Sequence, residues 1–411
     1  MRVLTRTEIR QVERWARNTQ IAKLLSFLDG LPRFIHIPRP LLLGSNNDRE
    51  VLVVGDTTTS RVRDVLANLD EPFNPNLQLQ RILSWKQREK PAGALSSIYQ
   101  QLRKGFPELC LLKGNGSCGQ KIVQAHSIQK ALFKKHAKNG HIYLFEVFTG
   151  KRDDENRLWP ELMGINEATT FSGFCDLHDS LTFAAIENSP FLNTIEHKFL
   201  YHYRAFAQTY YGRAHKFRVI ESAFKELATQ HSVTQLKSLA EKVRLNQQDV
   251  ADLEPMKRLY ECLLHANNWS TVEGYAFGGE LMPDFFMTEY FAPRKDFQGT
   301  IIQDTKTLGP LRWVSMTVTA SNDRAVFLLC GEKGCPILRQ IADSFRKLAV
   351  AARTGAVLNY TFCQFENFIL LPHWWESLAK DVQLQFVNAF AGRYYPRELP
   401  DICDWKLREL T

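Results

Sequence analysis

The sequence predicts an α+β protein in three parts: a basic N-terminal region that is helical or mixed, a small cysteine-containing module, and a C-terminal half of helices plus an antiparallel sheet. The composition of the 411 residues is ordinary for a globular chain, with 44% hydrophobic and 23% charged residues. Collagen-like, disordered and coiled-coil classes are therefore excluded. Helical patterns precede position 105, and from Ser270 to Gly331 the hydrophobic period changes to two.

The N-terminal region carries most of the excess positive charge of the chain. Residues 1–105 hold 17 Lys and Arg against 10 Asp and Glu. This imbalance favours a module that faces a polyanion, with Arg10, Arg14 and Arg17 as candidate nucleic-acid contacts. A solvated helix surface explains the same charges equally well. The elements expected here are a basic amphipathic helix at 7–28, a strand at Val51–Val54, and helices at 61–70 and 95–104.

Residues 106–185 bring cysteine and histidine together in two short segments. Cys110 and Cys118 flank a glycine-rich turn, and Cys175 and His178 are spaced as Cys-x-x-His. Zinc needs four soft or borderline ligands at tetrahedral positions, and two close pairs on tight turns commonly supply them. The sequence therefore predicts a structural zinc site formed by these four residues. The alternative interpretation is unrelated buried thiols and a surface histidine.

Between these two segments, the pattern predicts a strand at Lys121–His126, a helix at Ser127–Lys138 and a strand at His141–Phe145. Lys130, Lys134 and Lys138 recur every fourth residue, so a helix would place them on one face. A lysine stripe of this kind is typical of a surface that holds a nucleic-acid backbone. A solvated helix face accounts for it as well.

The remainder of the chain is expected to be helical at first and then rich in strands. Helix is predicted over 190–265, with breaks at Gly212 and Pro255. A meander of antiparallel strands follows, then a helix at Ile337–Thr354, a strand at Val357–Phe362 and further helix. The strands of the meander are Val272–Phe277, Phe285–Phe291, Thr300–Thr305, Val314–Thr319 and Val326–Cys330. The chain is thereby divided into four regions: 1–105, 106–185, 186–268 and 269–411.

The segments of the second region resemble the HNH, or ββα-metal, endonuclease family, over about residues 105–185. Lys121–His126 resembles the family's strand that ends in a catalytic histidine, and Phe174–Asp179 resembles the second zinc knuckle entering a helix. The resemblance implies a treble-clef-like zinc module, with His126 as general base and Asp179 as ligand of a catalytic Mg²⁺ or Mn²⁺. It also implies cleavage of phosphodiester bonds in DNA or RNA. Such modules with unfamiliar appendages occur in bacterial anti-phage defence.

Two other functions stay open at this point. The first is a non-catalytic zinc finger that binds nucleic acid or a protein partner within a larger assembly. The second is a PD-(D/E)xK-type nuclease, because Pro283-Asp284 is followed by Asp304-Thr305-Lys306. Those enzymes bind Mg²⁺ through carboxylates on adjacent strands, here the predicted strands Phe285–Phe291 and Thr300–Thr305.

The sequence favours a soluble, cytoplasmic protein that does not act at a membrane. No apolar run reaches the roughly 20 residues that span a bilayer, and the first residues lead into a charged amphipathic stretch and not into an apolar signal core. Eight cysteines are too few for a disulfide scaffold in a chain of this length, so we expect them to be reduced.

Overall fold

The computed structural model describes the backbone of β1 (Pro40–Gly44) and β2 (Val51–Val54), and most of the chain from Cys110 onward. The described segments are 110–113, 118, 121–147, 150–155, 157–227, 233–304, 311–391, 399–400 and 402–410, with the backbone alone over 215–227 and 233–247. The chain forms two compact units, Met1–Phe106 with Ala214–Asp249, and Pro107–Arg213 with Val250–Thr411. The four-region division stays a prediction. All of the following concerns the second unit except where β1 and β2 are named.

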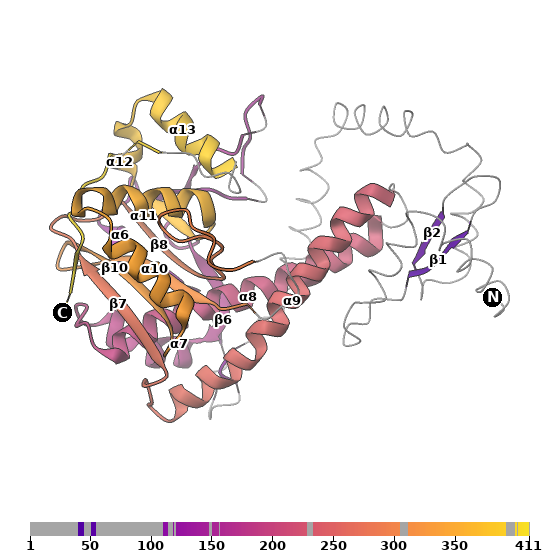
Figure 1. Ribbon diagram of the computed structural model, residues 1–411, viewed down its shortest axis with the longest axis horizontal. Coiled ribbons are helices and arrows are strands. Elements are labelled where there is room, and N and C mark those ends of the chain that lie inside the picture. The colour runs from indigo at the N-terminus through magenta and orange to yellow at the C-terminus, as the bar shows by residue number, and fades with distance from the viewer. Residues whose placement is uncertain are drawn as a thin grey trace. The chain divides into compact units, whose positions relative to one another are not determined.

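An eight-stranded sheet organises the second unit, and each of its strand pairings is antiparallel (Figure 1). The strand order is β12-β7-β10-β9-β8-β11-β4-β5. The predicted α+β class with an antiparallel sheet is therefore confirmed. The bounds are β4 His141–Leu144, β5 Glu161–Gly164, β7 Val272–Gly278, β8 Phe285–Phe291, β9 Val314–Ser321, β10 Arg324–Glu332, β11 Phe368–Leu370 and β12 Arg408–Glu409.

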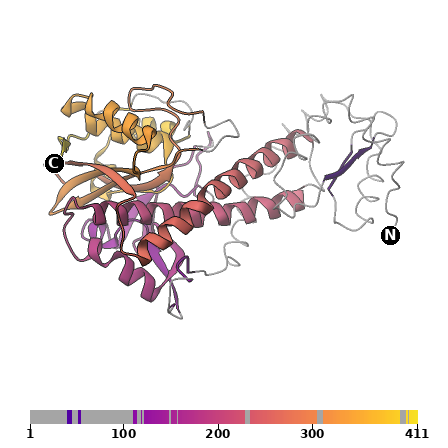
Figure 2. The ribbon, with the colours of Figure 1, turned by 60° about the horizontal axis from the view of Figure 1, so that its bottom comes forward.

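Helices cover both faces of this sheet (Figures 1 and 2). Along β10, Phe327 and Leu329 join one core with α10, α11 and α13, while Leu328 and Cys330 join another with α8 and α9. A strand buried on both faces is apolar throughout instead of alternating, as β10 is. The helices are α6 Lys130–Lys134, α7 Asp176–Glu187, α8 Ile195–Leu227, α9 Val233–His265, α10 Pro336–Arg346, α11 Val350–Gln364, α12 Pro372–Ser377 and α13 Lys380–Ala391.

The strand predicted at Val357–Phe362 is wrong, because these residues belong to helix α11. Val357, Leu358, Thr361 and Phe362 are all buried, which is the i, i+1, i+4, i+5 pattern of one helix face. The predicted helix at Ile337–Thr354 is in fact two helices, since α10 ends at Arg346 and α11 starts at Val350.

The breaks predicted at Gly212 and Pro255 are also wrong, because α8 and α9 continue through them. A glycine inside a helix costs only about 1 kcal/mol. Pro255 removes one backbone hydrogen bond, but Leu253 and Tyr260 on either side of it are buried in the core. The small cost explains the continuous helix at Gly212, and tertiary packing outweighs local propensity at Pro255.

The cysteine–histidine segments fold as a strand pair followed by a helix. Strand β3 (Ile122–His126) pairs antiparallel with β6 (Thr170–Cys175), and α7 starts directly after β6. The buried residues of this module share a continuous core with α8, α9 and one face of the large sheet. The module is thus anchored on the rest of the second unit.

The helix predicted at Ser127–Lys138 is much shorter in the structure, where α6 spans Lys130–Lys134. Its continuation turns back into β4, because Lys138 pairs with His141 across Asn139 and Gly140, both at positive φ (50° and 75°). The spacing predicts that Lys130, Lys134 and Lys138 share one helix face. This prediction is wrong for Lys138, which lies beyond the end of α6.

In the first unit, the strand predicted at Val51–Val54 is confirmed as β2, paired with β1. The helices predicted at 7–28, 61–70 and 95–104 lie outside the described residues, and so do Arg10, Arg14 and Arg17. Among the described helices, none is both long and apolar enough to cross a membrane.

Candidate metal centre

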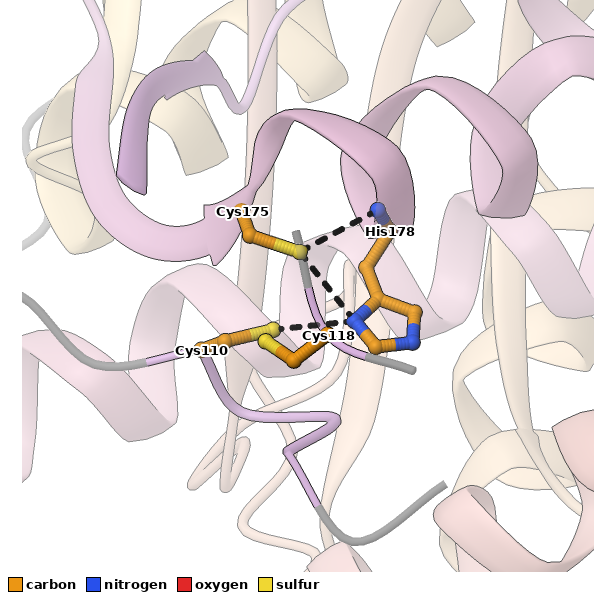
Figure 3. Close-up of side chains that lie close together, drawn as sticks. All are labelled: Cys110, Cys118, Cys175 and His178. Atoms are coloured by element: carbon orange, nitrogen blue, oxygen red, sulfur yellow. Dashed lines mark hydrogen bonds between the residues drawn. The ribbon is translucent and has the colours of Figure 1, made fainter. Parts of the chain in front are cut away.

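The four predicted zinc ligands come together beside the start of α7 (Figure 3). One ligand atom from each of Cys110, Cys118, Cys175 and His178 lies within 4.8 Å of all the others. His178 Nδ1 lies 3.2 Å from Cys110 Sγ and 3.3 Å from Cys175 Sγ. A tetrahedral zinc separates its ligand atoms by about 3.3–3.8 Å, so a single ion fits this cluster.

The backbone positions these ligands through short, local contacts. Cys175 ends β6 and is the N-cap of α7, and its Sγ accepts a hydrogen bond of 3.4 Å from the backbone N–H of His178. The turn at Cys110 is joined to β6 because the Leu111 N–H donates to the Gly173 carbonyl at 2.8 Å. A Cβ at Gly173 would lie 2.6 Å from the ring of Phe171 on the same strand, so a side chain at this position would force that buried ring to move.

Burial and donor chemistry identify the kind of metal that fits. Cys110 and Cys175 are 7% and 0% exposed, and burial raises the pKa of Cys110 to about 12. Thiols in this environment ionise only when a cation replaces their protons. Three sulfurs and one imidazole are typical of zinc, and four protein ligands leave no open position for a substrate. The cluster is therefore suited to a structural zinc.

His126 is the last residue of β3, and its ring is oriented by one strong contact. Its Nε2 lies 2.9 Å from the Ile165 carbonyl and must donate to it. In the neutral ring Nδ1 is then the basic nitrogen, and it forms no hydrogen bond to the described residues and is not fully buried. Partial burial lowers the pKa of His126. His126 is thus arranged as a neutral base at physiological pH.

Asp179 lies in the first turn of α7, one residue after the zinc ligand His178. Its carboxylate forms no hydrogen bond or ion pair with the described part of the chain, and burial raises its pKa. The nearby charges of Arg204 and Glu187 act on the pKa of both Asp179 and His126. The charges of one ion pair therefore reach both predicted catalytic residues.

A contact that the sequence did not predict holds the end of the histidine-bearing strand. Asn367, which precedes β11, donates from Nδ2 to Ser127 Oγ at 3.0 Å and to the Thr288 carbonyl at 2.8 Å. Ser127 Oγ also donates to the Thr169 carbonyl at 2.9 Å. The large sheet thereby fixes the backbone next to His126. Ser127 and Asn367 are 240 positions apart, and no local pattern connects them.

The lysines of the predicted nucleic-acid surface contact different partners. Lys130 Nζ donates to Asn166, Lys135 pairs with Asp323, and Lys138 Nζ lies 2.8 Å from Glu376. Lys134 is exposed on α6. Their role as nucleic-acid contacts stays a prediction, but they form no continuous stripe.

The residues of the rival PD-(D/E)xK pattern are not brought onto adjacent strands. Asp284 Oδ2 accepts a hydrogen bond of 3.0 Å from Trp405 Nε1. The strand predicted at Thr300–Thr305 is wrong over its described residues, where only Ile301 pairs, with Lys295. Strand β8 instead has β9 and β11 as its neighbours. Asp304 is exposed, and Lys306 lies outside the described residues.

Comparison of the chain with known protein families, curated proteins and solved structures finds no match. The functional argument therefore depends on the geometry of the Cys3His cluster and of the residues next to it.

Proposed function

We propose that the chain is a zinc-containing nuclease of the HNH, or ββα-metal, type. The order of its elements supports this, since a strand ending in His126, a paired strand and a helix surround a treble-clef-like Cys3His cluster. One observation carries the proposal. His126 Nδ1 and the Asp179 carboxylate are both without partners among the described residues, and both respond to the same neighbouring ion pair.

In this proposal each of the two residues has a separate task. His126 Nδ1 accepts a proton from a water molecule, which then attacks the phosphorus of a phosphodiester. The contact of Nε2 with the Ile165 carbonyl keeps the ring in the tautomer that this step requires. Asp179 would hold Mg²⁺ or Mn²⁺, and such an ion supplies charge neutralisation at the phosphate and the leaving oxygen. A carboxylate is a suitable hard ligand for either ion.

A second candidate is a non-catalytic zinc finger that binds a protein partner. Leu177 and Leu181, four residues apart on the outer side of α7, are 40% and 68% exposed. Apolar side chains presented together on a helix favour a protein contact. This function needs neither His126 Nδ1 nor the Asp179 carboxylate.

The experiment that separates these functions is a cleavage assay on zinc-loaded protein. Supercoiled plasmid and a structured RNA are each incubated with the protein in buffer alone, with Mg²⁺ and with Mn²⁺, after metal analysis has established one zinc per chain. We expect cleavage that requires the added ion. Cleavage abolished by Asp284→Ala or Lys306→Ala, and not by Asp179→Ala, would assign the chemistry to the PD-(D/E)xK residues. Absence of cleavage under all conditions would leave the binding module.

The pH dependence of cleavage follows from the environment of His126. Burial lowers the pKa of this histidine from 6.5, so its basic form persists to lower pH than that of an exposed histidine. Activity requires the neutral ring, and protonation on acidification removes it. We expect the acidic limb of kcat/KM against pH to have its midpoint below 6.5. Zinc content is measured at each pH as the control, and a midpoint above 7 with zinc retained would contradict this role for His126.

A further inference from the structure

Arg204 is a buried cation that the proposed chemistry has not used. It lies on α8, and its side chain is 3% exposed. Its guanidinium carbon is 4.1 Å from the centre of the Phe183 ring, and its Nη2 lies 2.5 Å from Glu187 Oε1. Phe183 and Glu187 both belong to α7, the helix that carries Asp179.

The spacing of residues on α7 places the two contacts of this guanidinium on the helix face of the proposed metal ligand, one and two turns away from it. Asp179, Phe183 and Glu187 are four residues apart and therefore share one face of the helix. Arg204 stacks on the middle residue of the three, one helical turn from Asp179. Gln129, three residues after His126, donates to the Glu187 backbone carbonyl at 3.0 Å. The segment that follows the histidine-bearing strand thus contacts the C-terminal end of α7, two helical turns from Asp179 on the same face.

The hydrogen-bonding capacity of Arg204 is only partly used. Within the described part of the structure its Nε is buried without a partner, although a guanidinium offers five donors. An unpaired buried donor is costly, and an anion that accepts its hydrogen bond would relieve that cost. The side chain of Glu187 is 36% exposed, so it can rotate towards solvent when another anion approaches.

A phosphate group has the shape and charge that this arrangement lacks. A divalent ion on Asp179 and a guanidinium one turn away repel each other, and an anion placed between them relieves that repulsion. The planar fork of arginine matches two oxygens of one phosphate, which a lysine cannot reproduce. We propose that Arg204 binds the phosphate on which His126 and Asp179 act, and that Glu187 occupies the guanidinium while no substrate is bound. This inference rests on the proposed nuclease function and extends it to a phosphodiester-binding residue outside the ββα unit.

The test measures binding without cleavage, in zinc-loaded protein that carries His126→Ala. A short fluorescein-labelled DNA duplex and the RNA duplex of the same sequence are titrated in Mg²⁺ at several salt concentrations. Arg204→Met keeps the packing on Phe183 and removes the charge. Glu187→Gln breaks the same ion pair and keeps the guanidinium, so it is the matched control.

We expect Arg204→Met to weaken binding at least tenfold and to reduce the log–log salt slope by about one. Glu187→Gln is expected to bind as tightly as its parent or more tightly. If Arg204→Met fails to fold or loses zinc, Arg204→Lys is used, with an expected loss of threefold or more at an unchanged salt slope. Equal effects of Arg204→Met and Glu187→Gln, or parental affinity in Arg204→Lys and Arg204→Met, would overturn the inference. This experiment measures binding and not cleavage. If the wild-type chain cleaves nothing, the nuclease proposal fails, but the experiment still shows whether Arg204 binds the phosphate. The DNA and RNA arms show which polymer supplies the phosphate.

Discussion

Replacement of Cys175 by alanine is expected to remove the zinc and to lower the free energy of unfolding by several kcal/mol. Structural zinc sites have apparent binding free energies of about 10–16 kcal/mol near neutral pH in small domains, and this binding energy contributes to folding. Cys175 ends β6, caps α7 and belongs to the core shared with α8 and α9. Loss of the ion therefore affects the packing of α8 and α9 on their face of the sheet.

Cys335→Ala is the matched control for this loss. Cys335 is also buried, at 7% exposed, but it lies at the start of α10 and contributes to the other core. We expect this variant to keep one zinc per chain and to lose only about 1 kcal/mol. The measurement is metal content together with thermal unfolding, with and without a chelator. If Cys175→Ala retains zinc and has the same melting temperature as Cys335→Ala, the cluster is not the metal site.

The second large effect is expected at His202, a histidine with no exposed surface in the core of the second unit. Its Nδ1 lies 2.8 Å from Ser315 Oγ, and its Nε2 lies 2.8 Å from the Tyr260 hydroxyl. A neutral imidazole satisfies one hydroxyl as donor and the other as acceptor. His202 thereby joins α8 to β9 and α9. Burial lowers its pKa to about 3.

This pKa makes the stability of the second unit depend on pH with a defined sign. The folded-state pKa lies below the unfolded value of about 6.5, so the unfolded chain binds the proton more readily. The contribution of His202 to the free energy of unfolding is complete above pH 6.5. It is lost as the pH falls from 6.5 towards 3, by up to about 1.4 kcal/mol per pH unit. We expect His202→Gln, which keeps a donor and an acceptor but does not titrate, to remove this part of the dependence.

The check is denaturant unfolding of wild type and His202→Gln at pH 7 and pH 4.5. The difference in unfolding free energy between the two pH values is expected to be about 2–3 kcal/mol smaller in the variant. Carboxylates and the zinc ligands titrate equally in both proteins and cancel in this comparison. His202→Leu, which removes one hydrogen bond from each of two buried hydroxyls, is expected to destabilise at both pH values by about 1–3 kcal/mol. An identical pH dependence in wild type and His202→Gln would show that folding does not change the pKa of His202, and would contradict this account.

The sequence predicted those parts of the site that depend on short-range patterns. Cys175 and His178 are three residues apart at a strand-to-helix junction, and Cys110 and Cys118 flank a sequence rich in glycine, so each pair is recognisable locally. The strands that were predicted correctly alternate, or are continuously apolar because helices cover both faces of the sheet. Val357–Phe362 was misassigned because its branched and aromatic residues favour strands locally, whereas the buried face of α11 determines the structure.

The contacts that complete the site could not be predicted because they join distant segments. The Ser127–Asn367 hydrogen bonds span 240 residues, and Asn367 has no local signature of its role. Glu187 and Arg204 are 17 residues apart on consecutive helices, and their pairing depends on how α7 packs against α8. Only the folded chain shows that the charges of this pair reach both His126 and Asp179.

The proposed nuclease is tested most directly by the single-turnover cleavage rate of zinc-loaded His126→Ala compared with wild type. His126 lies outside the Cys3His cluster, so the variant is expected to keep one zinc per chain and the wild-type melting temperature within a few degrees. Loss of a general base is expected to reduce the rate by about 10²–10⁴-fold. Cleavage by His126→Ala at the wild-type rate, with zinc retained, would contradict the assignment of the chemistry to the ββα module.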